Sequence, residues 1–292
     1  MNPAWGVRLY TSLIRVKPTD ALNCGVKPSH AADGDIPQQL LSAANAMMAV
    51  GVDTETGKID YHGLAQSEAF HHYALSTQAL RVFDLETLVD DQARRAFWIN
   101  LYNCLVIHAL VDWKVEGKIS SPYTIFDRMA YVVGGYRFSA NDIEHGILRA
   151  NAGHPYIPGP QFGADDPRLA YAVHELDPRV HFTLVCGAQS CPPIRHYDAD
   201  RMDFQLQVAA TNFINSGRVA IDREKLTVAL SRLFSWYAAD FGAALYGYRG
   251  RAHLLSYIAG YLQSEDDAAF VREHAHTLRI RFLPYDWTLN DR

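Results

Sequence analysis

The sequence predicts an α+β fold, a helix-rich single domain around a small and mostly antiparallel sheet. Of the 292 residues, 49% are hydrophobic and 20% are charged, which is typical of an ordinary globular protein. Long segments with apolar residues at helical spacing are separated by a few short runs of β-branched and aromatic residues. We expect residues 36–292 to form the domain. Residues 1–35, interrupted by proline and glycine, would form an N-terminal extension that either wraps the domain or stays mobile.

The first half of the domain is predicted to be mainly helical. Apolar residues recur at helical spacing over residues 37–49 and 92–111. The second segment is apolar on several sides, which predicts a buried helix at the centre of the domain. Between them, residues 57–61 suit a turn into a short extended piece. Residues 131–138 carry two glycines between β-forming residues, which predicts a hairpin whose turn requires positive φ.

Two capped helices are predicted after this hairpin. Ser139 suits the N-cap of a helix that runs to Arg149. Residues 151–164 are rich in glycine and proline and should form a long loop. Asp166 and Pro167 suit the cap and the first position of the next helix, which should end near residue 178.

The second half is predicted to mix strands and helices. Residues 180–186 are the best strand candidate of the chain, because β-branched and aromatic residues dominate them. The remaining predicted elements are a helix from Asp198 or Asp200 to Asn215, strands at 219–221 and 227–230, helices near 231–241, 251–263 and 266–274, and a strand at 277–282.

Composition and motifs exclude several classes of function. The net charge is −5 and no run of lysine or arginine occurs, so we expect no binding to nucleic acid or to anionic membranes. No stretch approaches the roughly 18 consecutive apolar residues of a membrane span, and the N-terminus lacks a signal-peptide core, which predicts a cytoplasmic protein. No phosphate-binding glycine loop and no Gly-x-Ser-x-Gly motif is present, so neither nucleotide binding nor serine hydrolysis is indicated. We expect no cofactor.

The segment Cys186–Pro193 is the predicted place of any chemistry. Cys191 follows small residues, Ser190 among them, and precedes two prolines that restrict the backbone. This setting suits a thiol that faces a substrate, and the backbone N–H groups of residues 187–190 could bind an oxyanion. Cys186 would share its strand face with core residues, and strand alternation would point His181 away from it.

Two histidines are candidates for the base of such a thiol. His145 lies near the start of its predicted helix, next to Glu144, and is the leading candidate. His181 is the second. Asn100 and Asn103 are unusual on a buried helix and need partners, so they either orient a catalytic histidine or tie the helix to a loop.

Three functional hypotheses follow from these residues. In the first, the protein is a thiol hydrolase or acyltransferase that acts on an amide or ester of a small molecule or peptide, with Cys191 as nucleophile. In the second, it is a binding module without catalysis, and the Asn, Glu and His residues form a structural network. In the third, Cys186, Cys191 and His196 hold a zinc ion, although their spacing is not that of a typical zinc site.

Several motifs in order also resemble a known family. They lie at residues 96–103, 134–135, 142–149, 177–182, 190–193, 231–237, 240–242 and 285–290. In this pattern the chain resembles the domain-of-unknown-function family 547 over roughly residues 36–290.

The resemblance implies that five residues belong to the polar signature of the family, namely Glu144, His145, His181, Cys186 and Cys191. Such a set suggests a cysteine–histidine site. It also allows a distant kinship with papain-like or transglutaminase-like enzymes. Those enzymes place the nucleophile at the start of a buried helix, a position that residues 98–103 occupy here.

Overall fold

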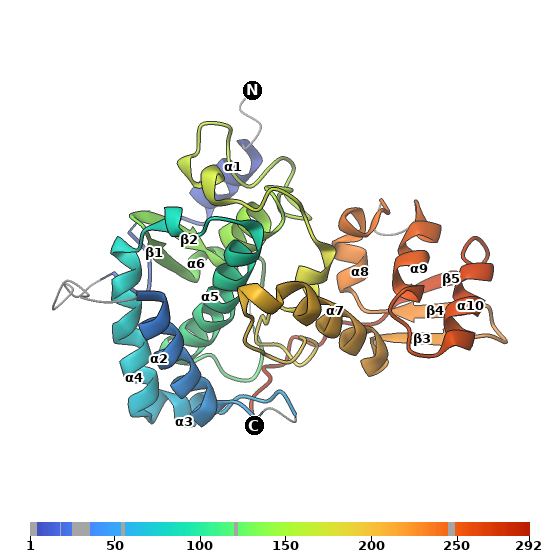
Figure 1. Ribbon diagram of the computed structural model, residues 1–292, viewed down its shortest axis with the longest axis horizontal. Coiled ribbons are helices and arrows are strands. Elements are labelled where there is room, and N and C mark those ends of the chain that lie inside the picture. Colours follow the sequence, from blue (N-terminus) through green and yellow to red (C-terminus); the bar gives the residue numbers. More distant parts are fainter. Residues whose placement is uncertain (1–4, 18, 25–35, 54–55, 120–121, 245–248) are drawn as a thin grey trace. The chain divides into compact units, whose positions relative to one another are not determined.

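The computed structural model describes residues 5–17, 19–24, 36–53, 56–119, 122–244 and 249–292, which form two compact units (Figure 1). The first unit comprises residues 1–175, 184–200 and 287–292, and the second comprises residues 176–183 and 201–286. The fold is α+β and rich in helix, as the sequence predicted. A single domain over residues 36–292 stays a prediction, because the described residues divide into these two units.

The first unit is built around one long helix. Its elements are α1 (Trp5–Leu13), α2 (Ile36–Gly51), α3 (Tyr61–Gln66), α4 (Glu68–Ser76), α5 (Asp91–Asp112), α6 (Pro122–Arg128), β1 (Ala130–Val133), β2 (Tyr136–Ser139), a π-helix (Asp142–Leu148) and short 3₁₀ turns at Thr77–Val82, Leu85–Thr87, Pro167–Tyr171 and Ala199–Arg201. The Asp90 side chain caps α5 by accepting from the Ala93 N–H, and almost every residue from Trp98 to Val111 is buried. The α3 helix packs against α5, and α2 and α4 pack against α3 and each other (Figure 1).

The predicted hairpin is confirmed in strand positions and turn. Strands β1 and β2 pair antiparallel, with Val133 opposite Tyr136. Gly134 and Gly135 have φ of 55° and 83°, the left-handed values that a tight turn of this kind requires. Ser139 caps the helix that follows, because its Oγ accepts from the Asp142 N–H at 3.0 Å.

The described part of the N-terminal extension contacts the hairpin of the first unit. Asn23 donates to the carbonyl oxygens of Thr77 and Val132, each at 2.9 Å, and accepts from the Val132 N–H at 2.8 Å. One buried amide therefore fixes this segment to the outer side of the hairpin. Residues 25–35, also assigned to the extension, lie outside the described residues.

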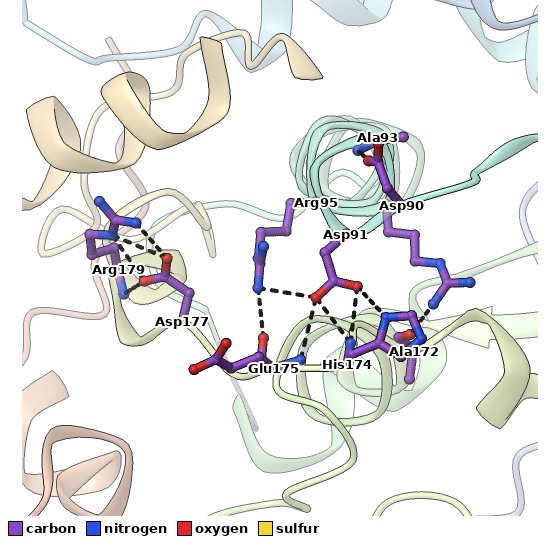
Figure 2. Close-up of polar contacts among 10 residues, drawn as sticks. Asp90, Asp91, Ala93, Arg95, Ala172, His174, Glu175, Asp177 and Arg179 are labelled. Carbon is purple, nitrogen blue, oxygen red and sulfur yellow. Dashed lines mark hydrogen bonds and ion pairs between the residues drawn. The ribbon is translucent and has the colours of Figure 1, made fainter. Parts of the chain in front are cut away.

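The predicted strand at residues 180–186 is wrong. Pro178–Phe182 forms a 3₁₀ turn instead, and residues 184–186 are irregular. The Asp177 side chain accepts from the Arg179 N–H at 2.9 Å and pairs with its guanidinium, as Figure 2 shows, while the proline starts the turn. This local cap outweighs the β-propensity of the residues after it. The alternation argument that separated His181 from Cys186 therefore has no basis.

Two neighbouring helix predictions also need correction. The helix expected from Pro167 to residue 178 is a short turn that ends at Tyr171, although Asp166 does cap it. The helix expected to be capped by Asp198 or Asp200 begins only at Met202, and its N-cap residue Arg201 makes no side-chain capping bond.

The second unit combines a three-stranded sheet with short helices. Its elements are α7 (Met202–Phe213), a π-helical turn (Ile214–Arg218), β3 (Val219–Asp222), β4 (Thr227–Leu230), α8 (Leu233–Trp236), a 3₁₀ turn (Ala238–Phe241), α9 (Arg251–Ala259), α10 (Glu265–Glu273) and β5 (Arg279–Phe282). Strand β4 pairs antiparallel with β3 and parallel with β5. A cluster of phenylalanines, Phe182, Phe213, Phe234 and Phe241, lies in the core of this unit. None of the helices described here has both the length and the apolar content to cross a membrane.

Candidate functional site

Two asparagines of α5 hold both ends of the segment that carries Cys186 and Cys191. Asn103 Oδ1 accepts from the Val185 N–H at 2.8 Å. Asn100 contacts Tyr197 twice, donating to its carbonyl oxygen at 2.8 Å and accepting from its N–H at 3.0 Å. Because residues three apart on a helix face the same side, the two amides form one anchoring row for the chain between 185 and 197.

The C-terminal segment holds the middle of the same loop. The Asn290 N–H donates to the Gly187 carbonyl at 2.9 Å, and the Gln189 N–H donates to the Thr288 carbonyl at 2.8 Å. The Tyr61 hydroxyl donates to Asn290 Oδ1 at 2.8 Å, so α3 supports this pairing. The loop between the two thiols is therefore anchored by three parts of the chain that are distant in sequence.

Gly187 is required by the shape of this loop. Its φ is +85°, a left-handed conformation that L side chains rarely adopt. A Cβ added there would overlap with Cδ1 of Leu110 on α5 and would lie 3.3 Å from the Tyr61 hydroxyl oxygen. The absence of a side chain at residue 187 thus allows the loop to lie directly on α5.

The two thiols of the loop lie close to each other. The Cys186 N–H donates to Cys191 Sγ at 3.1 Å, and both residues are partly exposed. Burial, followed by the electrostatic effect of Cys191 and then Cys186, raises the pKa of Tyr61 well above its ordinary value, and the Tyr61 hydroxyl lies against Gly187, between the two thiols. A backbone N–H that donates to sulfur favours the thiolate over the thiol. Ser190, between the thiols, is buried.

The other two cysteines differ from this pair. Cys104 is buried on α5, and burial raises the pKa of its thiol to about 12, which keeps it protonated at neutral pH. Cys24 is partly exposed in the N-terminal segment. None of the four cysteines forms a disulfide in the described part of the chain.

Glu144 and His145 lie buried on the π-helix, which packs against α5. The Tyr102 hydroxyl donates to Glu144 Oε2 at 3.2 Å. Tyr102 directly precedes Asn103, so consecutive residues of α5 contact the carboxylate and the thiol-bearing segment. The helix start predicted from sequence is confirmed, but its π form, which is often found at functional sites, carried no signal in the sequence.

Arg149 determines the protonation of His145. Its Nη1 donates to His145 Nδ1 at 3.1 Å and also to the Gly153 carbonyl. A guanidinium can only donate, so Nδ1 is the acceptor and the proton of the neutral imidazole lies on Nε2. The ring of His154 lies edge-on at 4.9 Å, and burial, followed by the charge of Arg149, lowers the pKa of His154 to about 4. Sequence reasoning missed both Arg149 and His154.

His181 belongs to the second unit and pairs there with an acid. Its Nε2 contacts Asp240 Oδ2 at 2.7 Å, and its ring stacks on Tyr237 with centroids 3.9 Å apart. The other ring nitrogen, Nδ1, is buried and has no hydrogen-bond partner among the described residues. Asp240 and Tyr237 were not predicted as site residues, although both lie in the motifs at 231–237 and 240–242.

The structure provides no geometric support for the zinc alternative. Among the residues that it describes, no three His, Cys, Asp or Glu side chains are grouped so that they could hold a metal ion. His196 contacts Asp198 at 3.0 Å.

A separate polar cluster fixes the start of α5, as Figure 2 shows. Asp91 accepts from the His174 N–H at 3.0 Å and from its Nδ1 at 2.8 Å, and Arg95 donates to the Glu175 carbonyl at 2.6 Å. Although burial alone would raise the pKa of Asp91, the hydrogen bonds from His174 hold it below its ordinary value. The cluster ties residues 172–175 to the helix, and we assign it a structural role.

Comparison with known proteins gives one match. Residues 85–214 match a family described as protein of unknown function, DUF547. This range contains α5, the hairpin, the π-helix and both thiols of the loop, whereas the motifs at 231–242 and 285–290 lie outside it. No match was found among the curated proteins or among the solved structures, so the kinship with papain-like or transglutaminase-like enzymes has no support from them. Over residues 85–214 the chain is thus similar to DUF547, a family of unknown function, which confirms the resemblance that its motifs indicated.

Proposed function

We propose that this protein is a thiol hydrolase or acyltransferase in which Cys191 attacks an amide or ester carbonyl of a small molecule or peptide. The hydrogen bond of 3.1 Å from the Cys186 N–H to Cys191 Sγ is the observation that carries the proposal. A donor aimed at sulfur stabilises the thiolate, which is the nucleophilic form. Cys191 is partly exposed, whereas Cys104 is buried.

The anchored loop supports the proposal because a nucleophile must be held in place. The two amides of α5 and the C-terminal segment fix the chain on both sides of Cys191. In the reaction, the sulfur would form a bond to the carbonyl carbon and the carbonyl oxygen would take the electron pair. Of the N–H groups in residues 187–190, Gln189 already donates to Thr288, so the oxyanion would be bound by the other amides of the loop.

We assign His145 the role of a hydrogen-bond donor to this oxyanion. Because Arg149 donates to Nδ1, the proton of the neutral imidazole lies on Nε2, and acceptance of a proton at Nδ1 would require the Arg149 contact to break. Glu144, held by Tyr102, is the neighbouring carboxylate that positions the π-helix. The reaction requires a reduced thiol, which agrees with the cytoplasmic location expected from the sequence.

Alkylation kinetics test the nucleophile. Purified protein is treated with iodoacetamide at neutral pH, and the modification of each cysteine is followed by mass spectrometry. We expect Cys191 to react at least about tenfold faster than Cys24, which corresponds to a thiol pKa lower by about one unit. Cys104 serves as the buried reference and should react last. Equal and slow labelling of Cys191 and Cys24 would refute the proposed nucleophile.

A second measurement separates the two possible roles of His145. Alkylation needs only the thiolate, whereas acylation of Cys191 by p-nitrophenyl acetate also develops an oxyanion. A donor role predicts that His145→Ala slows acylation and leaves alkylation unchanged. Removal of a general base would slow both reactions and shift the pH profile of alkylation. His72→Ala, an exposed position on α4, is the matched control and should change neither rate.

The binding-module alternative rests on the amide contacts. Asn100 and Asn103 bind loop backbone, as they would in a module whose polar residues only maintain its shape. For that alternative, Cys191 should label no faster than Cys24, and p-nitrophenyl acetate should not acylate it.

A further inference from the structure

The loop contains a second thiol, that of Cys186, which has no role in the proposed reaction. Cys186 is partly exposed, lies five residues before Cys191 and donates its backbone N–H to the sulfur of that residue. The Tyr61 hydroxyl lies against Gly187, between the two thiols. Gly187, in its left-handed conformation, turns the chain between them.

Their separation is compatible with a covalent bond. The N–H contact is 3.1 Å, and a hydrogen bond directed along N–H then places Cys191 Sγ about 4 Å from Cys186 Cα, from ordinary bond lengths and angles. Adding the length of the Cys191 side chain to this distance limits the two Cα atoms to a separation of about 7 Å, near the upper end of the disulfide range. Formation of the disulfide would therefore require the two side chains to rotate and the loop to adjust slightly.

We propose that Cys186 and Cys191 form a reversible disulfide that hydroperoxides generate and thiols reduce. The Cys191 thiolate attacks one peroxide oxygen, the O–O bond breaks, and the sulfur becomes a sulfenic acid while hydroxide leaves. The Cys186 thiol then attacks this sulfur, the S–O bond breaks, and the products are the disulfide and water. Two electrons pass from the thiols to the peroxide, and a low-molecular-weight dithiol returns them.

The same contacts explain why this pair would react and the other cysteines would not. Cys104 is buried and protonated, and Cys24 has no neighbouring thiol within its anchored segment. Disulfides in reducing compartments are usually transient and redox-sensing, which fits two partly exposed thiols in one loop. As a switch that removes the nucleophile, this inference rests on the proposed function, whereas the formation of the bond does not.

Peptide mapping of the full chain tests the inference. Reduced, desalted protein is treated with stoichiometric hydrogen peroxide, blocked with N-ethylmaleimide and digested with trypsin. Both thiols fall in the tryptic peptide 180–195, because no lysine or arginine lies within it before Arg195. We expect this peptide to lose two hydrogens and to take up no maleimide, before Cys24 loses a measurable fraction of its labelling. Dithiothreitol should restore both thiols.

Variants identify the steps. In Cys186→Ser, Cys191 should stop at the sulfenic acid and react with dimedone, and no intramolecular disulfide should form. Cys24→Ser is the control and should oxidise like the unmodified protein. A peptide 180–195 in which Cys186 still takes up maleimide while Cys191 carries sulfinic acid or an intermolecular disulfide would overturn the inference. Because unmodified protein gives the main readout, the test does not depend on the folding of any variant.

The outcomes also separate this inference from the proposed function. Fast alkylation of Cys191 without the disulfide would leave the thiol enzyme and remove the switch. The disulfide without any preference of iodoacetamide for Cys191 would leave a redox pair and remove the nucleophile.

Discussion

Gly187→Ala is the substitution that most directly tests how the thiol loop lies on α5. An alanine at this position must keep the left-handed backbone conformation, which costs about 1–2 kcal/mol for an L-residue. It must also displace the Leu110 side chain, since the new Cβ would overlap with its terminal carbon, and overpacking of this kind costs about 1–3 kcal/mol. We expect a total loss of about 2–5 kcal/mol in the free energy of unfolding.

Gly135→Ala is the matched control for this effect. Gly135 belongs to the same unit and has φ of +83°, close to the +85° of Gly187, but a Cβ there would meet no atom within 4 Å. Gly135→Ala should therefore lose only about 1–2 kcal/mol in the free energy of unfolding, the cost of the left-handed backbone. Urea unfolding followed by circular dichroism gives both values, and the rate of Cys191 alkylation should change only in Gly187→Ala. Equal destabilisation of the two variants would show that the loop does not press against Leu110.

Three further predictions concern buried polar groups. Burial raises the pKa of Asp127 to about 7, above its unfolded value, so this carboxyl stabilises the fold below about pH 4, and the stabilisation is lost as the pH rises to about 7. Across that window Asp127→Asn should gain up to about 4 kcal/mol in the free energy of unfolding relative to the unmodified protein. A difference between the two proteins that does not change with pH would contradict the pKa shift. Burial lowers the pKa of His108 to about 4, so the stability that the neutral ring contributes is lost as the pH falls from about 6.5 to 4. In His108→Gln the free energy of unfolding, measured by urea titration at several pH values, should fall less over this range. Asn103→Ala leaves a buried loop N–H without its acceptor, so it should lower the free energy of unfolding by about 1–3 kcal/mol and slow the alkylation of Cys191. Asn215→Ala, at an exposed position, should lower the free energy of unfolding by less and leave the alkylation rate unchanged. Equal effects of the two variants would argue against the anchoring role of Asn103.

The elements with strong local signals were predicted with nearly correct limits. The helix predicted at residues 92–111 is α5, and the strands predicted at 227–230 and 277–282 are β4 and β5. Their apolar patterns follow the helix or strand period along the chain, and burial follows that pattern. The prediction failed at residues 180–186, because the Asp177 cap and the proline after it form a turn that outweighs the β-forming residues beyond.

The candidate site was only partly predictable for a different reason. Cys191 could be chosen from its small neighbours and the prolines after it, which are local features. The Tyr61 hydroxyl that lies against Gly187, between the thiols, belongs to a helix more than a hundred residues earlier in the chain. Similarly, no spacing in the sequence indicated that Asp240 would pair with His181.

The sequence by itself determined that α5 is buried, that two glycines form the hairpin turn and that one loop carries two thiols. Each of these features depends on residues within about one or two turns of each other, so composition and period carry them. Only the tertiary structure decided which donor meets which acceptor: Asn103 with the loop at Val185, Tyr102 with Glu144 and Arg149 with His145. A buried polar group needs a partner, but its residue type does not specify which one, because the fold brings together atoms from distant parts of the chain.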